Sequence, residues 1–384
     1  MAGAPAYPAL NSENTCDDIN RCRTLFHIIW SSLTTIFLCT WVSLHLNVPP
    51  PRQGFQARVW RKLRMMLFAL IAPEVMLGFA ARQYFIASRF TTREYCVSPT
   101  HAFFIVMGGF VTREGHHPIV TKTQLPRYSK AIKAIPEADI KDKSKSDTLA
   151  KSLTLAKVVL FALQYVARLT KSLPISALET ATVAFAGIHI ITWWFWREKP
   201  RDVSEAILIE VTEREQMEAE ALRRLAVGDH LNAILFGDYR EYDPTSSTSV
   251  PSFWSAAYAE GLPKIALFFQ LLFAILFGAV HCLAWNSSFP SAIEMWIWRA
   301  CASLITGLPL LSFLLMQVQK KFPRGSAPRT VLTLINWALM ALYPSARVTL
   351  LILTFTTLRD LPLRMFIDVN WSTAFKHLLL PRVT

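Results

Sequence analysis

The chain has 384 residues, of which 52% are hydrophobic and only 17% are charged, against roughly 25% charged residues in an average soluble domain. The apolar residues lie in long blocks and the mean hydropathy is +0.31, which excludes a soluble protein, or one disordered over most of its length, and predicts a membrane protein. The formal charge of +13 comes from basic segments beside these blocks, so membrane lipid, and not nucleic acid, is the expected partner.

A polar tail at residues 1–23 precedes the first apolar block, residues 24–46. At about 1.5 Å per helical residue this block is long enough to cross a hydrocarbon core of about 30 Å. The segment that follows, residues 52–64, is basic and contains no acid, whereas the tail contains acidic residues. Because basic loops stay in the cytoplasm, we expect an extracytoplasmic N-terminus, in either the plasma membrane or an endomembrane.

Two cysteines in the tail bracket a polar segment just before the first block. If this segment lies outside the cytosol, Cys16 and Cys22 can form a disulfide, since oxidising compartments favour one. The alternative is a pair of free thiols on a flexible tail.

The next region, residues 65–111, has two short apolar blocks and contains Pro73 and Glu74. It is followed by a lysine-rich loop, residues 112–151, which should also be cytoplasmic. Two cytoplasmic loops cannot flank one simple span. Residues 65–111 therefore either enter and leave the membrane as a hairpin or lie in its interface, and the basic, amphipathic, Pro-containing pattern favours the interface.

The rest of the chain contains further apolar blocks at residues 148–170, 175–196, 265–285, 296–316 and 330–358. The last block is broken by Pro344 and Arg347, so it is either one kinked span or a tight hairpin. Residues 197–262 are predicted to form a cytoplasmic amphipathic helix, at 203–227, and a loop. The predicted fold is all-α, a polytopic transmembrane bundle of about six spans plus an interfacial or re-entrant segment. The membrane regions are 24–196 and 263–358, with a C-terminal tail at 359–384.

Polar residues at helical spacing form a stripe on each of two consecutive predicted helices, a feature that we term the polar ladder. Its residues are Lys157, Gln164 and Arg168 on the first helix, and Glu179, Thr182 and His189 on the second. An antiparallel hairpin would stack them as three pairs, Arg168 with Glu179 among them. Charges at bilayer depth usually mark pathways, sites or partners. The polar ladder is thus either a hydrated conduit or pocket, or a purely structural clamp.

A second candidate site lies in the lysine-rich loop, where Arg113, Glu114, His116 and His117 place two imidazoles beside a carboxylate. Such groups bind metals or move protons. Since no third ligand has a recognisable spacing and adjacent loop histidines are usually solvated, no metal or cofactor is predicted. The sequence contains no nucleophile elbow, P-loop or dinucleotide-binding glycine pattern.

Several phrases of the sequence are specific in wording: CDDINRCRTLFHIIW, FLCTWVSLHLNVPPP, LIAPEVMLGFAARQ, MGGFVTREGHHPI, DKSKSD and WREKPRDV. Over most of residues 16–204 the chain resembles a large fungal group of multi-pass membrane proteins. This resemblance implies a membrane protein and carries no catalytic residue with it. DKSKSD departs from a DKSKGD pattern at Ser146.

From the polar ladder we expect translocation of an ion or small solute along a polar helix hairpin. The alternatives are a membrane-embedded enzyme acting on a lipid or isoprenoid substrate, and a membrane scaffold or receptor. An enzyme would need convergent acids or a metal cluster at one depth, and the sequence does not assemble them.

Overall fold

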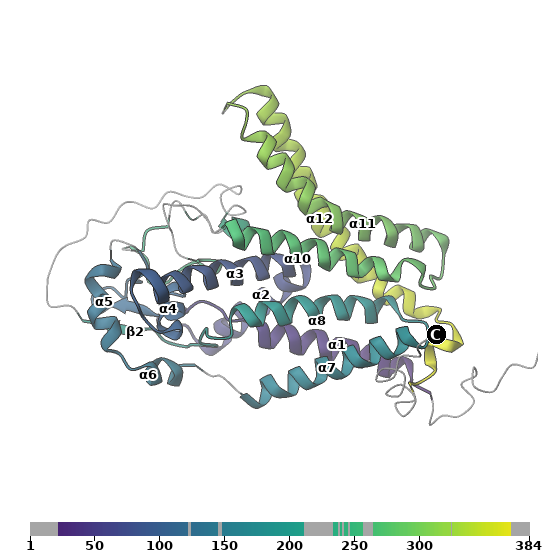
Figure 1. Cartoon of the computed structure of the whole chain (residues 1–384), viewed down its shortest axis with the longest axis horizontal. Coiled ribbons are helices and arrows are strands. Elements are labelled where there is room, and N and C mark those ends of the chain that lie inside the picture. Colours follow the sequence, from purple (N-terminus) through teal and green to yellow (C-terminus); the bar gives the residue numbers. More distant parts are fainter. Residues whose placement is uncertain are drawn as a thin grey trace, which may run out of the picture. The chain divides into compact units, whose positions relative to one another are not determined.

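The computed structural model describes residues 22–121, 124–144, 148–210, 233–236, 239, 242–244, 246–255, 264–323 and 325–369. The protein is all-α, as predicted (Figure 1). Its longest helices are α1 (Leu25–Ser43), α7 (Thr148–Thr170), α8 (Ala177–Phe195), α10 (Lys264–Cys282), α11 (Ala292–Gln319) and α12 (Ala327–Thr356). Shorter α-helices of the described residues are α2 (Phe55–Ile71), α3 (Pro73–Arg89), α4 (Pro99–Val106), α5 (Leu125–Ala134) and α6 (Glu137–Asp142).

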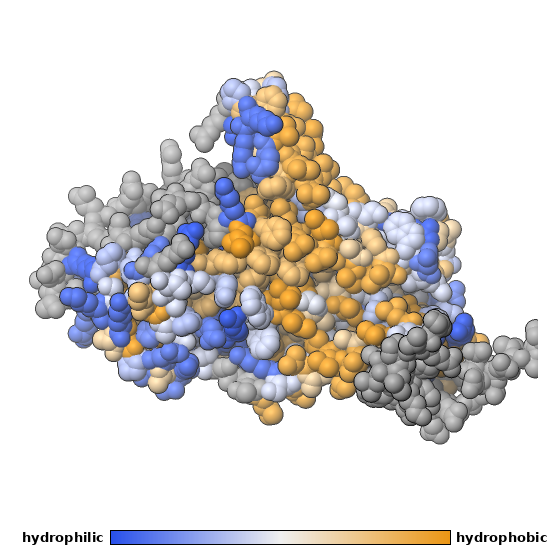
Figure 2. Space-filling model, in the orientation of Figure 1, coloured by the Kyte–Doolittle hydropathy of each residue, from blue (hydrophilic) through white to orange (hydrophobic). Residues whose placement is uncertain are grey.

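Within the described residues, five segments are long and apolar enough to cross a membrane: Leu25–Ser43, Leu149–Thr170, Lys264–Asn286, Ala292–Gln319 and Ala327–Arg359. Many of their large apolar side chains are exposed, as lipid-facing side chains are, and Figure 2 shows apolar residues covering much of one face of the molecule. The last predicted block forms one helix rather than a hairpin. These helices indicate an integral membrane protein. The predicted span at residues 175–196 corresponds to α8. This helix is not one of the five long apolar segments, and most of its residues are buried.

Helices α2 and α3 meet at a bend of 112° and together could form a sixth, broken span or a re-entrant segment. Proline explains the break. Pro73 occupies the first turn of α3, and Ala72 before it has φ −137° and ψ 64°, outside the helical region. Proline has no N–H to continue a helix and disfavours helical geometry in the preceding residue. The bend fits the predicted alternatives for residues 65–111.

The chain divides into two compact units whose segments alternate along the sequence. Unit 1 contains the described residues of Met1–Phe37, Thr154–Ala186 and Leu276–Thr384. Unit 2 contains the described residues of Leu38–Leu153 and Gly187–Ile275. The boundaries fall inside α1, α7, α8 and α10, so each of these helices contributes one end to each unit.

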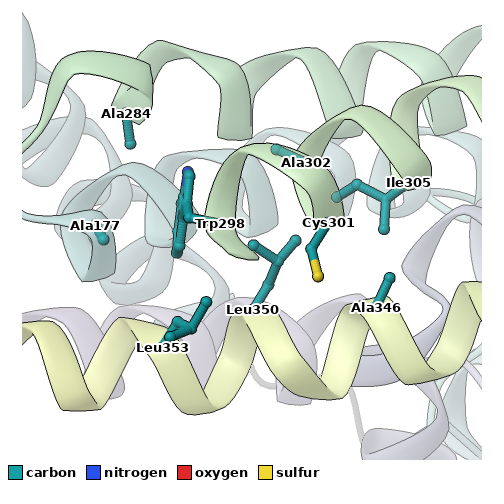
Figure 3. Packing of buried hydrophobic residues seen from close by; sticks show 9 residues of the cluster. All are labelled: Ala177, Ala284, Trp298, Cys301, Ala302, Ile305, Ala346, Leu350 and Leu353. Carbon is teal, nitrogen blue, oxygen red and sulfur yellow. The ribbon is translucent and has the colours of Figure 1, made fainter. Parts of the chain in front are cut away.

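In unit 1, an apolar cluster joins α11 to α12 (Figure 3). On α11 its residues are Trp298, Cys301, Ala302 and Ile305, spaced three and four apart, and α12 contributes Ala346, Leu350 and Leu353 at the same kind of spacing. Residues at these spacings share one face of a helix. The two helices therefore pack through matching apolar stripes, with Ala177 and Ala284 completing the cluster.

In unit 2, two short strands pair in parallel, β1 (Phe110–Thr112) with β2 (Ile207–Ile209). Strand β2 differs from the amphipathic helix predicted at 203–227, which does not begin where expected. Ile207 and Ile209 are β-branched residues that suit a strand, and Phe110 supplies a partner at the register Phe110↔Ile207. The remainder of the predicted helix, from residue 211, lies outside the described residues.

Candidate functional site

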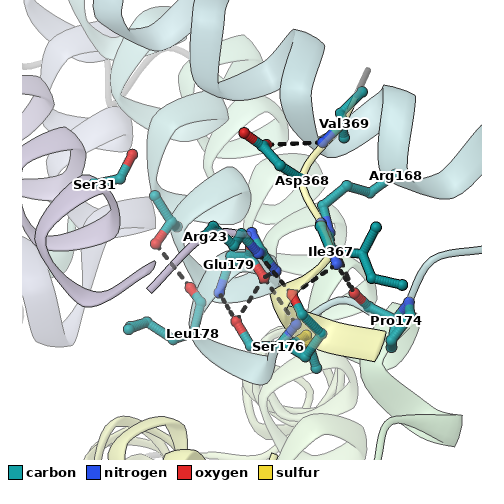
Figure 4. Close-up of polar contacts among 12 residues, drawn as sticks. Arg23, Ser31, Arg168, Pro174, Ser176, Leu178, Glu179, Ile367, Asp368 and Val369 are labelled. Atoms are coloured by element: carbon teal, nitrogen blue, oxygen red, sulfur yellow. Dashed lines mark hydrogen bonds and ion pairs between the residues drawn. The ribbon is translucent and has the colours of Figure 1, made fainter. Parts of the chain in front are cut away.

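The polar ladder residues are at the predicted helical positions, and most are inaccessible. Arg168, Glu179, Thr182 and His189 are buried, whereas Lys157 and Gln164 are half-buried. The pairing, however, differs from the predicted stack. Arg23, from the segment before α1, forms the ion pair with Glu179, and its Nη2 lies 3.2 Å from Glu179 Oε2 (Figure 4). Glu179 therefore has a charged partner from outside the polar ladder.

Glu179 also belongs to a capping box at the start of α8. The Glu179 backbone N–H donates to Ser176 Oγ at 3.2 Å, and Glu179 Oε2 accepts from the Ser176 backbone N–H at 3.0 Å and from its hydroxyl at 2.8 Å. This reciprocal pattern satisfies free N–H groups at a helix N-terminus. The Ser-x-x-Glu spacing at 176–179 was visible in the sequence and would have identified Ser176 as a partner.

Arg168 has no carboxylate partner within ion-pair distance in the described part of the chain, because it donates to backbone carbonyls instead. Its Nη1 donates to Ile367 O at 2.7 Å, and its Nη2 donates to Pro174 O at 2.8 Å and Met365 O at 3.1 Å. Arg23 Nε donates to the same Met365 carbonyl at 2.7 Å. Arg168 and Arg23 together hold the segment 365–367 against the α7–α8 turn.

Three of the remaining polar ladder residues form hydrogen bonds to hydroxyl groups on α1 or to a carbonyl within α8. Lys157 Nζ donates to Ser31 Oγ on α1 at 3.0 Å, and the Thr182 hydroxyl donates to Leu178 O within α8 at 2.8 Å. His189 lies in unit 2, where its ring nitrogens are 3.2 Å from Thr40 Oγ1 and 2.9 Å from Ser43 Oγ. The α7–α8 hydrogen bond beside the polar ladder joins Tyr165 to Thr180 at 3.3 Å.

The second candidate site does not gather into a cluster. Arg113 pairs with Glu210, and both side chains are exposed. Glu114 and His116 are also exposed, while His117 Nδ1 lies 3.0 Å from Ser247 O. Among the described residues, no group of three or more His, Cys, Asp or Glu side chains could hold a metal ion.

The cysteine pair is seen only in part. Cys22 is disulfide-bonded, but Cys16 lies outside the described residues, and the Cys16–Cys22 pairing stays a prediction.

Unit 2 contains a buried polar cluster that sequence reasoning missed. Lys199, just after α8, is 3% exposed, and its ammonium donates to His45 O, to Gln83 Oε1 at 2.7 Å and to Asn47 Oδ1 at 3.2 Å. The ammonium also lies 4.7 Å from the Trp196 ring centroid. These residues come from three of the specific phrases, SLHLNVPPP, GFAARQ and WREKPRDV. Their place in these specific phrases was the only signal that the sequence offered. It did not indicate that these residues contact one another.

Electrostatics in this cluster follow from burial. Burial lowers the pKa of the Lys199 ammonium well below its usual range, and the charge of Arg61 acts in the same direction. Burial also lowers the pKa of the His45 imidazole well below its usual range, and Lys199, Lys151 and Arg201 add to that effect by charge repulsion. The cluster therefore disfavours additional positive charge.

The chain is all-α, and its long apolar helices indicate an integral membrane protein. The chain belongs to a family of unknown function (DUF8562), whose profile matches residues 6–233, more than half of the 384 residues. The match includes Arg23, Arg168, Glu179 and Lys199 and ends before α10. No curated protein and no solved structure matches the chain.

Proposed function

We propose that the protein moves anions or small acidic solutes across a membrane. The observation that carries this proposal is the sign of the buried charges in unit 1. The proposal rests on five buried ionisable side chains among the described residues of this unit. They are three arginines, one histidine and one carboxylate: Arg23, Arg168, Arg347, His281 and Glu179. Charges at bilayer depth cost roughly 2.5–3.5 kcal/mol each on insertion scales and usually mark pathways or sites. A mostly basic set favours an anionic substrate.

Arg347 is the central residue of the proposal. It is fully buried inside α12, about 14 Å of helix before the end at Thr356. Its guanidinium carbon lies 4.2 Å from the ring centroid of Phe277 on α10 and 5.2 Å from that of Phe185 on α8. Aromatic faces stabilise a guanidinium without cancelling its charge. These ring contacts place a buried guanidinium among α8, α10 and α12.

His281 lies one helical turn after Phe277 on α10, and its ring centroid is 4.9 Å from that of Phe277. Helices α8, α10 and α12 thus bring Arg347, His281 and two aromatic rings together. Within the polar ladder, Arg168 and Glu179 position the helix ends in this proposal, while Lys157 and Gln164 remain candidates for solute contact because they are half-buried.

The test is flux into vesicles that contain the purified full-length chain and either a halide-sensitive or a potassium-sensitive dye. We expect chloride or iodide entry that exceeds potassium entry. Arg347→Met should slow it at least tenfold, since about 1.4 kcal/mol on a barrier is already a factor of ten. Arg299→Met is the matched control, because Arg299 lies on α11 and donates to Trp285 O in an exposed position. Full flux through Arg347→Met, or equal potassium entry, would refute the proposal.

A scaffold or receptor is the second candidate. It is favoured by the contacts through which Arg23 and Arg168 hold residues 365–367, with Glu179 serving as the partner of Arg23. In that case vesicles that contain the wild-type protein should show no flux above that of empty vesicles. Substitutions at Arg23 or Glu179 would still alter the stability of the protein.

A further inference from the structure

Unit 2 holds an arginine whose donors are buried and unsatisfied. The Arg201 side chain is 5% exposed, and neither its Nε nor its Nη1 has a hydrogen-bond acceptor in the described part of the chain. Leaving buried donors of a charged group without acceptors is costly. In proteins such a group is usually satisfied by a bound molecule or ion that accepts from its donors.

The neighbouring carboxylate is already engaged by another cation. Asp202 accepts from Lys62 Nζ through both oxygens, at 2.9 and 2.8 Å. Arg201 Nε lies 3.5 Å from Asp202 Oδ2, an ion pair without a hydrogen bond. Two cations therefore share one anion, and Arg201 keeps its donors available.

The backbone of Arg201 is fixed in place. Its N–H donates to Ser144 Oγ at 2.9 Å, and the Ser144 hydroxyl is 3.1 Å from Arg201 O. Ser144 belongs to the DKSKSD segment. The guanidinium thus projects from an anchored residue rather than from a mobile loop, and a preorganised donor loses less entropy when it binds a ligand.

Further positive charge surrounds this position. The charge of Arg201 acts on the ammonium groups of both Lys62 and Lys151, and Lys62 and Arg201 contact the same carboxylate, Asp202. Arg201 follows the end of α8, close in sequence to Trp193, Trp194 and Trp196, residues that suit a membrane–water interface, whereas Lys151 lies on α7. Basic pockets at such interfaces bind phosphate groups of lipids.

We propose that Arg201, together with Lys62 and Lys151, forms a binding site for a phosphate group, either in the headgroup of an anionic phospholipid or in free phosphate. The planar guanidinium offers parallel N–H donors that match two phosphate oxygens, and the lysines supply point charge. This site lies in unit 2 and does not depend on the proposed flux through unit 1.

The experiment measures thermal stabilisation of the full-length protein in a neutral detergent, because a ligand that binds only the folded state raises the melting temperature. Three probes are titrated separately: inorganic phosphate, phosphatidic acid and phosphatidylcholine, with sodium chloride added to equal ionic strength. We expect saturable stabilisation by phosphatidic acid or by phosphate, and none by phosphatidylcholine. A response to phosphatidic acid alone identifies a lipid headgroup, and a response to both identifies the phosphate group itself.

Arg201→Met should weaken the apparent affinity at least tenfold. Arg201→Lys keeps the charge but removes the parallel N–H donors of the guanidinium, so it should also weaken binding. Because this variant should retain the fold, it tests the proposal even if Arg201→Met does not fold. Arg197→Met is the matched control, since Arg197 is four residues away, carries the same charge and is exposed. The proposal is overturned if neither phosphate nor phosphatidic acid stabilises the protein, or if both Arg201 variants bind like the wild type. It is also overturned if Arg197→Met weakens binding as much as the Arg201 variants do.

Discussion

Arg168 shows how a buried cation can be accommodated by backbone carbonyls from three residues instead of by a carboxylate. Carbonyl dipoles satisfy its N–H groups but leave its net charge in place. Glu179, in the first turn of α8, accepts hydrogen bonds from Arg23 and from Ser176. At the scale of single residues, the stability of this region therefore rests on Arg23, which was absent from the predicted stack.

Removing either partner of the Arg23–Glu179 pair should destabilise the protein strongly. A buried charge left without its partner costs roughly 3–5 kcal/mol, whereas replacing both partners with apolar residues often costs little. We expect Arg23→Met and Glu179→Gln each to lower the melting temperature in detergent, and Arg23→Met with Glu179→Leu to recover much of the loss.

The exposed pair Arg113–Glu210 provides a matched control, because its side chains are 67% and 69% exposed. Arg113→Met and Glu210→Leu should change the melting temperature little, alone or together. Additive losses in the Arg23 and Glu179 variants would show that the two side chains do not act as a pair.

At the scale of helices, the length of the apolar blocks was sufficient to locate the longest described helices, whereas α5 and α6 were missed because they lie in the predicted lysine-rich loop. The predicted helix 148–170 is α7 (Thr148–Thr170), and 175–196 became α8 (Ala177–Phe195). Length and apolar spacing are local properties, so they can be read along the chain. The partners of the polar ladder could not be read in this way, since Arg23 and Glu179 are 156 residues apart and Arg23 and Met365 are 342 apart.

The contact between α10 and α11 depends on one glycine. A Cβ added at Gly278 would lie 2.6 Å from Thr306 Cα and 2.7 Å from Thr306 N, so the helix backbones would have to separate. Small residues allow such close approach between membrane helices. We expect Gly278→Ala to cost about 1–3 kcal/mol of stability, the usual range for overpacking, measured by thermal unfolding in detergent.

Gly307 on α11 is the control, because a Cβ there would meet nothing within 4 Å. Gly307→Ala should leave stability unchanged or raise it slightly, since alanine is the better helix former. If both variants unfold at the wild-type temperature, the backbones of α10 and α11 are not in close contact.

At the scale of the whole molecule, the topology remains a prediction from the basic loops. We expect α5 to lie in the cytoplasm and the segment between α10 and α11 to lie outside. Lys133→Cys and Ser288→Cys test this, because both positions are exposed. An impermeant maleimide should label Ser288→Cys in intact cells and Lys133→Cys only after permeabilisation. Both variants carry Cys96→Ser, since the native Cys96 is exposed. Labelling of Lys133→Cys in intact cells would invert the scheme.

The carbonyl contacts of Arg168 have a consequence for biogenesis. Arg168 and Met365 are 197 residues apart, so at about 5–20 residues per second a ribosome needs roughly 10–40 s to supply the acceptor after the arginine has been made. During that interval the guanidinium is already part of a membrane helix but lacks two of its three carbonyl acceptors. A nascent chain in this state presents an incompletely satisfied charge to the insertion machinery and its chaperones. A stop codon that removes residues 362–384 would make that interval permanent and should direct the truncated protein to degradation.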